Sequence, residues 1–362
     1  LALRKEASFT ALDSQTILLI NQCFKMQLAM TNYKTTSPSV SLQARPTKAR
    51  TSRTLRQATR MEADVKSYPS VSAPANFKQP EPRALTVTRP KEQALSLITG
   101  SAALALRLAS GVFVLGWKIE SVNKAVPEGK YSLSVGPMTL RDVSSVLGDA
   151  PRPQQPLVLY EFEASPPCRK VREVAALLDL EVLYKPCPGA KTGFSDELFA
   201  KTGRRTCPYL EDPNTGKAMF ESEDQIDYML ETYGPAKDAY DSKSLWPMRG
   251  NFASITSGFA ALVRGLKGIK MQPNARPDNI QMRPLELWGY ECSPFVRPVR
   301  EKLDVLGLPH VMVPCSRGSV NRDRMMQLKG NFQVPYLVDP NTGIDMFESC
   351  EIVEYLEEVY TA

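Results

Sequence analysis

Residues 208–216 read PYLEDPNTG and residues 335–343 read PYLVDPNTG, so a stretch of nine residues occurs twice with one difference. The similarity extends on both sides of this motif. Residues 157–233 align with residues 285–360 at an offset of 128 at their starts and 127 at their ends. An internal repeat of this length indicates two copies of one structural unit. We call residues 157–233 copy one and residues 285–360 copy two.

Each copy has a readable order of helices and strands. In copy one, a short apolar strand precedes Ser-Pro and a helix with one apolar face. A second strand, a polar segment with a weak helix, and two strands joined by the DPNTG turn follow, and a last helix begins at Ser222. This βαβ-α-ββα order predicts an α/β fold, a four-stranded mixed sheet with helices on both faces. We expect two such domains in tandem, at 157–235 and 285–362.

The N-terminal 60 residues differ in composition from the rest of the chain. They hold ten Lys or Arg against Glu6 and Asp13, and no acidic residue occurs between Ser14 and Met61. Frequent Ser, Thr and Arg without acidic residues are typical of an organelle transit peptide, and the Ser/Thr content favours a plastid over a mitochondrion. A plain disordered tail is the alternative. We therefore predict a transit or disordered segment at 1–60, followed by a linker at 61–93.

Charge and composition exclude several classes of function. The net charge of +6 comes from the first 60 residues, and the remainder has a net charge of −2, which does not support a nucleic-acid partner. The seven cysteines form no C-x-x-C pair and fit no zinc spacing, so we expect no metal site. His310 is the single histidine, which nearly excludes a mechanism that needs a histidine base.

Three motifs in each copy resemble one known family. S-P-x-x-R-x-V-R follows the first strand, P-Y-L precedes the third, and E-S opens the last helix. This constellation resembles the N-terminal domain of glutathione transferases and the glutaredoxins, which have the thioredoxin fold. The chain is most similar to plant and algal plastid proteins with two such domains in tandem. The resemblance implies thioredoxin-like domains at both copies and glutathione as the bound cofactor or thiol substrate.

The resemblance implies catalytic roles at the start of the first helix of each copy. Ser165 and Ser293 match the position at which this family activates sulfur, where the helix dipole and N–H groups stabilise a thiolate. In serine-type transferases the hydroxyl donates a hydrogen bond to the glutathione sulfur. Cys168 matches the second thiol of the glutaredoxin motif. An ordinary helix cap is the alternative interpretation of each Ser-Pro.

The remaining implied site residues would hold the glutathione backbone. The resemblance places a cis-proline at Pro208 and Pro335 and assigns the backbone of the preceding residue to the cysteinyl part of the ligand. The last helix would bind the γ-glutamyl end through its opening Glu-Ser pair. A helix cap with an acidic first turn is the alternative. The implied binding residues are Cys207, Pro208, Glu221 and Ser222 in copy one, and Val334, Pro335, Glu348 and Ser349 in copy two.

Apolar segments precede both copies. Residues 94–117 predict an apolar helix, and residues 252–269 predict an amphipathic helix with a wide apolar stripe. A membrane span, a helix on a membrane surface, and a helix packed on protein remain open for these segments. We expect linker or irregular structure at 118–156 and a linker at 236–284 around the second helix. We expect no all-helical domain of the kind found in full transferases after either copy, and therefore no standard electrophile pocket.

Two functions fit these observations. The first is a glutathione-binding, glutathione-transferase-like plastid protein with weak transferase or monothiol activity at Ser293 and Cys168. The alternative is a non-catalytic thioredoxin-fold scaffold or accessory subunit of a plastid, thylakoid-associated complex. Both predict a location in the chloroplast, in the stroma or on the stromal face of a membrane. The segments 94–117 and 252–269 would contact a protein complex or a membrane surface.

Overall fold

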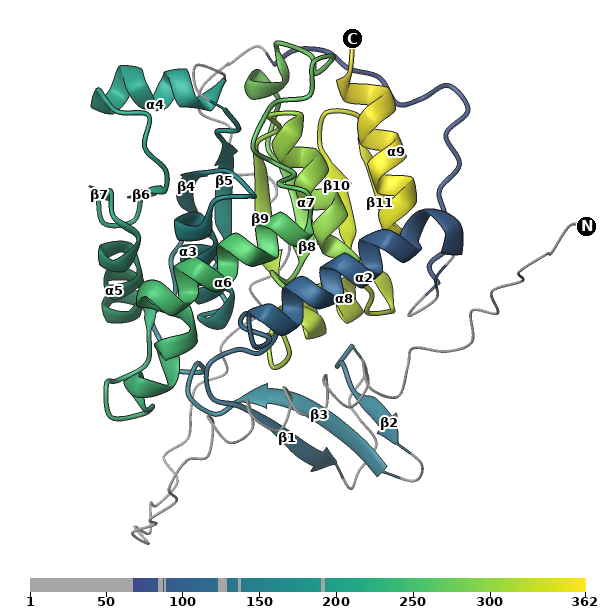
Figure 1. Cartoon of the computed structure of the whole chain (residues 1–362). Coiled ribbons are helices and arrows are strands. Elements are labelled where there is room, and N and C mark those ends of the chain that lie inside the picture. The colour runs from purple at the N-terminus through teal and green to yellow at the C-terminus, as the bar shows by residue number, and fades with distance from the viewer. Residues whose placement is uncertain (1–67, 84–86, 88, 123–128, 136–137, 190–192) are drawn as a thin grey trace, which may run out of the picture.

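The computed structural model describes residues 68–83, 87, 89–122, 129–135, 138–189 and 193–362. The predicted transit segment at 1–60 lies outside these residues. The largest element is an eight-stranded sheet in the order β11-β10-β8-β9-β5-β4-β6-β7. Copy one supplies one half of this sheet and copy two supplies the other, as Figure 1 shows.

The two halves have the same order of elements, as the repeat predicts. Copy one contains β4 (Leu157–Glu161), α3 (Pro166–Leu177), β5 (Val182–Pro186), α4 (Phe194–Thr202), β6 (Tyr209–Asp212), β7 (Lys217–Met219) and α5 (Ser222–Tyr233). Copy two contains β8 (Leu285–Gly289), α7 (Val296–Val305), β9 (His310–Pro314), α8 (Asn321–Lys329), β10 (Tyr336–Asp339), β11 (Ile344–Phe347) and α9 (Ser349–Tyr360). In each half one pair of strands is parallel and the others are antiparallel.

The second strands of the two copies pair with each other. β5 and β9 are antiparallel, with Tyr184 opposite His310 and Val182 opposite Met312. This pairing joins two four-stranded sheets into one, and each copy covers the inner sheet edge of the other. An edge strand offers unpaired backbone groups, so the mutual pairing removes two such edges at the centre of the molecule.

Successive side chains along each strand point to opposite faces of the sheet, and the two faces pack against different helices. Leu157 and Leu159 of β4 and their counterparts Leu285 and Leu287 of β8 belong to one large core, shared with α3, α5, α7 and α9. The opposite face carries two smaller clusters. Tyr160 packs with Phe194 and Leu198 of α4, and Trp288 packs with Met325 of α8. The period of two along each strand therefore places four helices on one face and α4 and α8 on the other.

The repeated DPNTG motif has a structural role. The carboxylate of Asp212 accepts hydrogen bonds from the Tyr228 and Tyr233 hydroxyls, both at 2.5 Å, and from the backbone N–H of Asn214 at 2.8 Å. Burial opposes ionisation of Asp212, but these hydrogen bonds lower its pKa below the ordinary value. In copy two, Asp339 accepts from Tyr355 and Tyr360 in the same way. The motif thus connects the β-turn to the last helix of each copy.

Two helices form an outer layer over the face of the sheet that α3, α5, α7 and α9 cover. They are α2 (Pro90–Leu106), which precedes copy one, and α6 (Gly250–Val263), which precedes copy two. Figure 1 shows both helices crossing in front of the helices that cover the sheet. Short 3-10 helices at Ser242–Met248 and Asn279–Gln281 lie in the segment between the copies. None of the helices among the described residues is long and apolar enough to span a membrane.

Both predicted apolar helices end earlier than expected. The helix predicted at 94–117 occupies 90–106, because Leu108 and Ala109 adopt φ of 50° and 58°, in the left-handed region that ends a helix. The helix predicted at 252–269 occupies 250–263, and Leu266 has φ of 54°. In both segments an arginine, Arg107 or Arg264, is the last residue before the turn.

The expectation of a linker or irregular structure at 118–156 is wrong in part. Three antiparallel strands in the order β1-β3-β2 form a separate small sheet, comprising β1 (Trp117–Val122), β2 (Leu133–Val135) and β3 (Met138–Ser144). β1 is short and most of its side chains are exposed, so it adds little to a hydrophobic core. Asp142 attaches this sheet to copy two through a salt bridge to Arg317 at 3.0 Å.

Candidate functional site

Both predicted serines are buried at the start of the first helix of their copy. Ser165 is 2% exposed and Ser293 is 1% exposed. The hydroxyl oxygen of each accepts a backbone N–H three residues later, from Cys168 and Val296, at 3.3 Å in both cases. This is the geometry of a helix cap, the alternative that the sequence left open. In this arrangement each hydroxyl oxygen acts as an acceptor within its own helix start.

The outer helices cover the two Ser-Pro motifs in a crossed manner. The backbone of Gly100 on α2 lies against Pro294 of copy two, so that a Cβ atom at Gly100 would come within 3.1 Å of the Pro294 Cβ. Gly258 on α6 lies against Pro166 of copy one, where a Cβ atom would come within 3.9 Å of the Pro166 Cγ. Each helix therefore covers the motif of the copy that it does not precede. A ligand sulfur could reach either serine only after the covering helix moves.

Cys168 and Cys207 of copy one are in surroundings that favour the thiol form. Cys168 is fully buried, and burial raises its pKa well above the ordinary value. Cys207 is half-buried, and a hydrogen bond with Cys187 together with burial raises its pKa. Neither Cys168 nor Cys207 forms a disulfide. The nucleophilic form of a cysteine is the thiolate, so this geometry does not support the monothiol role expected for Cys168.

The predicted prolines directly precede β6 and β10, and the Glu-Ser pairs stand at the starts of α5 and α9. The Cys207–Pro208 and Val334–Pro335 peptide bonds are both cis. Glu221 and Glu348 stand at the N-caps of α5 and α9. The two copies differ in burial, since Glu221 is exposed whereas Glu348 is 6% exposed.

The Glu348 carboxylate of copy two is engaged by other parts of the chain. One of its oxygens accepts the backbone N–H of Arg83 at 2.6 Å and the side-chain amide of Gln333 at 2.7 Å. We call residues 77–83 the N-terminal strap. The strap also contacts α9 and β11, because the Phe77 ring lies 5.8 Å from that of Tyr355 and Gln79 donates to the Asp345 carbonyl at 2.9 Å. An N–H donor thus occupies the position at which the resemblance places the ligand ammonium.

A cavity of about 250 Å³ adjoins this pair in copy two. It lies between α2, the start of α7 and the start of α9, and Ser349 and Cys350 at the N-terminus of α9 line it. Backbone N–H groups at a helix N-terminus favour an anion. Lys267, whose side chain is 61% exposed, adds a positive charge to the wall. The further lining residues are Gln93, Ser96, Leu97, Pro294, Phe295, Pro298, Val353 and Glu354.

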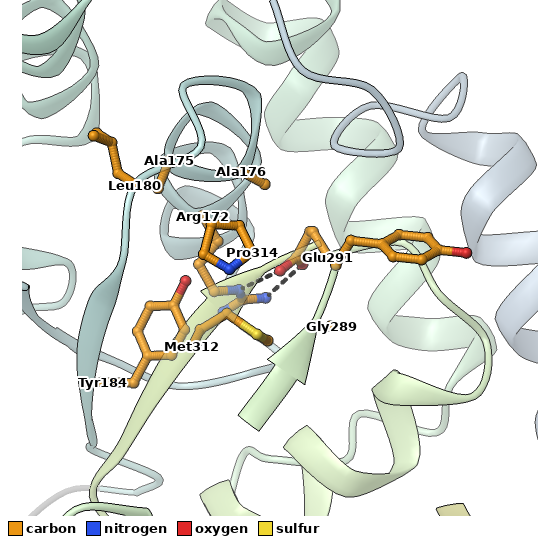
Figure 2. Close-up of a pocket in the computed structure, with 10 residues that line it drawn as sticks. Arg172, Ala175, Ala176, Leu180, Tyr184, Gly289, Glu291, Met312 and Pro314 are labelled. Carbon is orange, nitrogen blue, oxygen red and sulfur yellow. Dashed lines mark hydrogen bonds and ion pairs between the residues drawn. The ribbon is translucent and has the colours of Figure 1, made fainter. Parts of the chain in front are cut away.

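A second cavity, of about 10 Å³, lies between the two copies and is drawn in Figure 2. Arg172 of copy one reaches into it and binds the Glu291 carboxylate of copy two, with Nε and one oxygen 3.2 Å apart. Tyr184 and Met312 complete its walls. Its volume suits at most a water molecule. We therefore place the candidate ligand site in the larger cavity.

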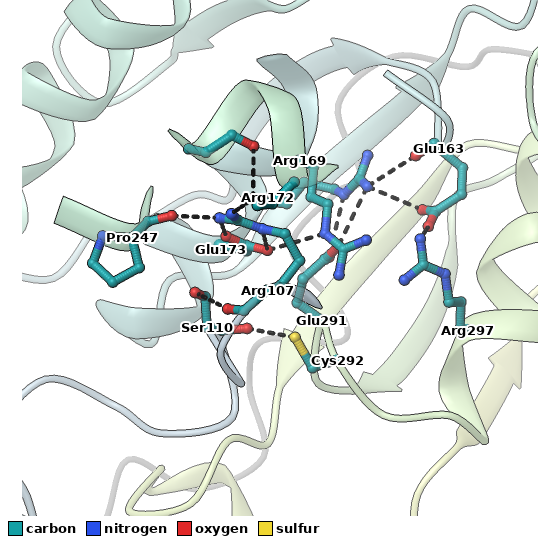
Figure 3. A network of polar contacts seen from close by, with 12 residues as sticks. Arg107, Ser110, Glu163, Arg169, Arg172, Glu173, Pro247, Glu291, Cys292 and Arg297 are labelled. Atoms are coloured by element: carbon teal, nitrogen blue, oxygen red, sulfur yellow. Dashed lines mark hydrogen bonds and ion pairs between the residues drawn. The ribbon is translucent and has the colours of Figure 1, made fainter. Parts of the chain in front are cut away.

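Sequence reasoning missed a buried network of arginines and carboxylates, part of which Figure 3 shows. The arginines at its centre belong to the S-P-x-x-R-x-V-R motif of each copy. Glu163 of copy one pairs with Arg300 of copy two at 2.6 Å, and Arg172 of copy one pairs with Glu291 of copy two. Arg107 pairs with Glu173 and Arg264 pairs with Glu301, which anchors each outer helix. All of these side chains are at least nine-tenths buried.

The family model described as glutathione S-transferase, N-terminal domain, matches residues 159–237 of this chain and again residues 287–362. Both copies are therefore similar to the glutathione S-transferase N-terminal domain. This match supports the predicted α/β fold of thioredoxin type and the resemblance from which the site residues were inferred.

Relatives of this domain include glutathione S-transferase-like proteins of fungi. The gedE protein of Aspergillus terreus is 34% identical over 80 residues, which cover 22% of this chain and 35% of the relative. The OpS6 protein of Beauveria bassiana is 32% identical over 79 residues, covering 22% and 36%. The chain thus spans about a third of the length of these curated relatives. A solved glutathione S-transferase of Drosophila melanogaster is 34% identical, covering 25% of this chain and 41% of its own, with a TM-score of 0.21.

Proposed function

We propose that this protein is a glutathione-binding, glutathione-transferase-like protein of the chloroplast, and that copy two holds the ligand. The observation that supports this most is the cavity at the N-terminus of α9, which Ser349 lines beside Glu348. The similarity of copy two to the glutathione S-transferase N-terminal domain supports the same ligand.

The residues of copy two fit glutathione at one end. The Ser349 hydroxyl and the N–H groups of the first turn of α9 would bind the γ-glutamyl carboxylate, and Lys267 would add an opposite charge. Glu348 would accept from the ligand ammonium in place of the Arg83 N–H that it now accepts. The backbone of Val334, before the cis proline, would pair with the cysteinyl part of the ligand. Bound glutathione would supply the thiol.

Transferase chemistry would require a rearrangement of α2. Ser293 is buried under this helix and caps α7, so its hydroxyl donates to a ligand sulfur only when the contact between Gly100 and Pro294 opens. We therefore propose that binding is the principal property of copy two and that any transferase activity is weak. In copy one, Ser165 is covered in the same way, which gives Ser165 and Cys168 no better access.

We expect glutathione binding to depend on the Glu-Ser pair of copy two. Replacing Glu348 and Ser349 together with alanine removes the ligands for both charges of the γ-glutamyl end. Charge-assisted hydrogen bonds contribute roughly 1.5–3 kcal/mol each, so isothermal titration should show affinity reduced about tenfold or more. Glu348 also binds the strap, so the fold of the variant must be checked separately. Circular dichroism would establish that the variant is folded.

The matched control is the same double replacement in copy one. Glu221→Ala with Ser222→Ala changes the equivalent pair in the copy that we do not assign as the main site. Its affinity should equal that of the wild type. Loss of binding in the copy-one variant alone would move the site to copy one, and equal affinity in all three proteins would contradict both assignments.

A second candidate function is a non-catalytic scaffold in a plastid protein complex. Burial of Ser165 and Ser293 as helix caps favours it, because neither hydroxyl is available in this arrangement. Stable co-purification with a large thylakoid-associated complex, together with no heat of glutathione binding, would support the scaffold over the first candidate.

The proposed location rests on the composition of the first 60 residues, which are rich in Ser, Thr and Arg. We expect residues 1–60 fused to a fluorescent protein to direct it into chloroplasts of plant cells. A fusion in which the arginines between 45 and 60 are replaced with glutamate should remain outside, because transit peptides are poor in acidic residues. Fluorescence throughout the cytosol for both fusions would contradict the location.

A further inference from the structure

The helix α6 turns its small residues toward the protein and its large apolar residues toward solvent. Its inward side consists of small residues, with Ala253, Ser257 and Ala260 all at most 1% exposed. Its outward side carries large apolar residues, and Ile255, Phe259 and Leu262 are 58%, 55% and 57% exposed. A surface helix of a water-soluble protein normally turns its large apolar residues inward. We therefore infer that another surface covers the outward side of α6.

The apolar surface continues beyond α6. Leu95 and Ile98 on α2, which packs against α6, are 72% and 58% exposed. At the other end, the exposed ring of Trp246 stacks near that of Phe252, with ring centroids 4.7 Å apart. We call this surface the outer apolar face; its members are Leu95, Ile98, Trp246, Phe252, Ile255, Phe259, Leu262, Val263, Leu266 and Ile269. Contiguous exposed surfaces of this kind mark sites of association.

The segment that contains α6 carries only positively charged side chains among its ionisable Lys, Arg, Asp and Glu positions. Residues 242–277 contain six Lys or Arg and no Asp or Glu. Lys243, Lys267 and Lys270 are exposed, whereas Arg264 is turned inward to Glu301. Asp227 and Glu223 of a neighbouring element pair with Arg249. Glu301 lies 4.0 Å from Lys267, and Glu354 lines the same cavity as Lys267. An apolar stripe with lysines beside it and tryptophan at one end has the chemistry of a helix lying in the surface of an anionic bilayer.

We propose that the outer apolar face docks on an anionic lipid bilayer, with α6 and α2 lying in the plane of its surface. The large apolar side chains of α6 enter the boundary between headgroups and acyl chains, and the lysines contact the lipid phosphates. The observations that support this attachment are separate from those that support the glutathione site in copy two, although α2 and Lys267 lie beside both. The attachment places the candidate cavity beside the membrane surface, because α2 and Lys267 contribute to both.

The test is flotation of the full chain with vesicles. Vesicles of phosphatidylcholine with about 30% phosphatidylglycerol should carry the protein, vesicles of phosphatidylcholine alone should carry little, and salt near 0.5 M should weaken the association. Phe259→Asp and Leu262→Asp should each reduce the bound fraction about tenfold or more, because each places a charge in the apolar layer. Both residues point outward, and circular dichroism would establish that the variants are folded.

The control is Phe199→Asp on α4. Phe199 is 47% exposed and lies on the opposite face of the sheet, so its replacement should leave vesicle binding unchanged. The basic N-terminal residues are present in every variant and cannot produce a difference among them. Equal binding of wild type, Phe259→Asp and Leu262→Asp would overturn the proposal. A dimer in light scattering that Leu262→Asp dissociates, without vesicle binding by the wild type, would also overturn it in favour of self-association.

Trp246 provides a second readout. It is 44% exposed, whereas Trp117 and Trp288 are buried, so a change in the surroundings of the apolar face affects mainly the emission of Trp246. Binding to anionic vesicles should shift the emission to shorter wavelength, and Trp246→Phe should abolish most of this shift. A shift of equal size in Trp246→Phe would contradict insertion of this face.

Discussion

Replacing Glu163 with glutamine should lower the free energy of unfolding by about 3–5 kcal/mol, because it removes one partner from a buried set of ion pairs. The Glu163 carboxylate is 3% exposed and binds Arg300 at 2.6 Å, with Arg297 and Arg172 each at 3.3 Å. Burial opposes its charge, but these three guanidinium groups hold the pKa of Glu163 well below the ordinary value. Glutamine keeps the shape and leaves buried positive charges without a counter-charge. Urea denaturation would measure the change.

A matched control separates burial from charge pairing. Glu231 pairs with Lys237 at 3.2 Å, but its side chain is 65% exposed. Exposed ion pairs contribute about 0–1 kcal/mol, so Glu231→Gln should change the free energy of unfolding by less than about 1 kcal/mol. If both variants lost the same small amount of stability, the network would not be holding the two copies together.

The second expected result concerns His310, which should make the protein less stable as the pH falls from about 6.5 towards 4. His310 is 1% exposed at the pairing of β9 with β5, and its Nδ1 lies 3.0 Å from the Leu308 carbonyl oxygen. Burial lowers its pKa to about 4, although the Leu308 carbonyl opposes the shift. The unfolded chain binds a proton near pH 6.5, whereas the folded chain does so only near pH 4. At about 1.4 kcal/mol per unit, this group removes about 3 kcal/mol over that range.

His310→Asn should abolish this contribution. An asparagine amide can donate to the Leu308 carbonyl in place of Nδ1–H, and it does not titrate. Glu161, whose pKa burial raises to about 7, acts with the opposite sign at overlapping pH, because the folded state binds its proton more tightly. The informative quantity is therefore the difference between wild type and His310→Asn, measured by urea denaturation at several pH values. A difference that stays constant from pH 7 to 4.5 would be inconsistent with a buried neutral histidine.

The local architecture of each copy could be predicted from sequence because it depends on local patterns. The DPNTG turn, the apolar strands and the amphipathic first helix act over a few residues, and the repeat supplies each signal twice. The antiparallel pairing of β5 with β9 could not be predicted, since it joins strands more than 120 residues apart and carries no motif. The strands at 117–144 were missed because they are short, and β1 is largely exposed.

The sequence predicted which residues form the candidate site, but it could not predict whether a ligand can reach them. The motifs located the serines, the prolines and the Glu-Ser pairs. Whether Ser293 serves as a cap or as a ligand for sulfur depends on α2, which lies far away in sequence and covers Pro294. The contact between Arg83 and Glu348 is also non-local. The arginines of the first helices would normally indicate a solvated face, and they are buried only because the two copies meet there.

The crossing of the two outer helices makes the chain comparable to a domain-swapped dimer whose protomers are joined by a peptide linker. In such a dimer each subunit gives an arm to its partner and receives one in return. Here α2 stands before copy one and covers copy two, and α6 stands before copy two and covers copy one. A cut between the copies would therefore not release two self-sufficient domains. Each fragment would keep an arm that its arginine anchors but whose Ser-Pro contact lies on the other fragment, and its own Ser-Pro motif would be open to water until the two fragments met.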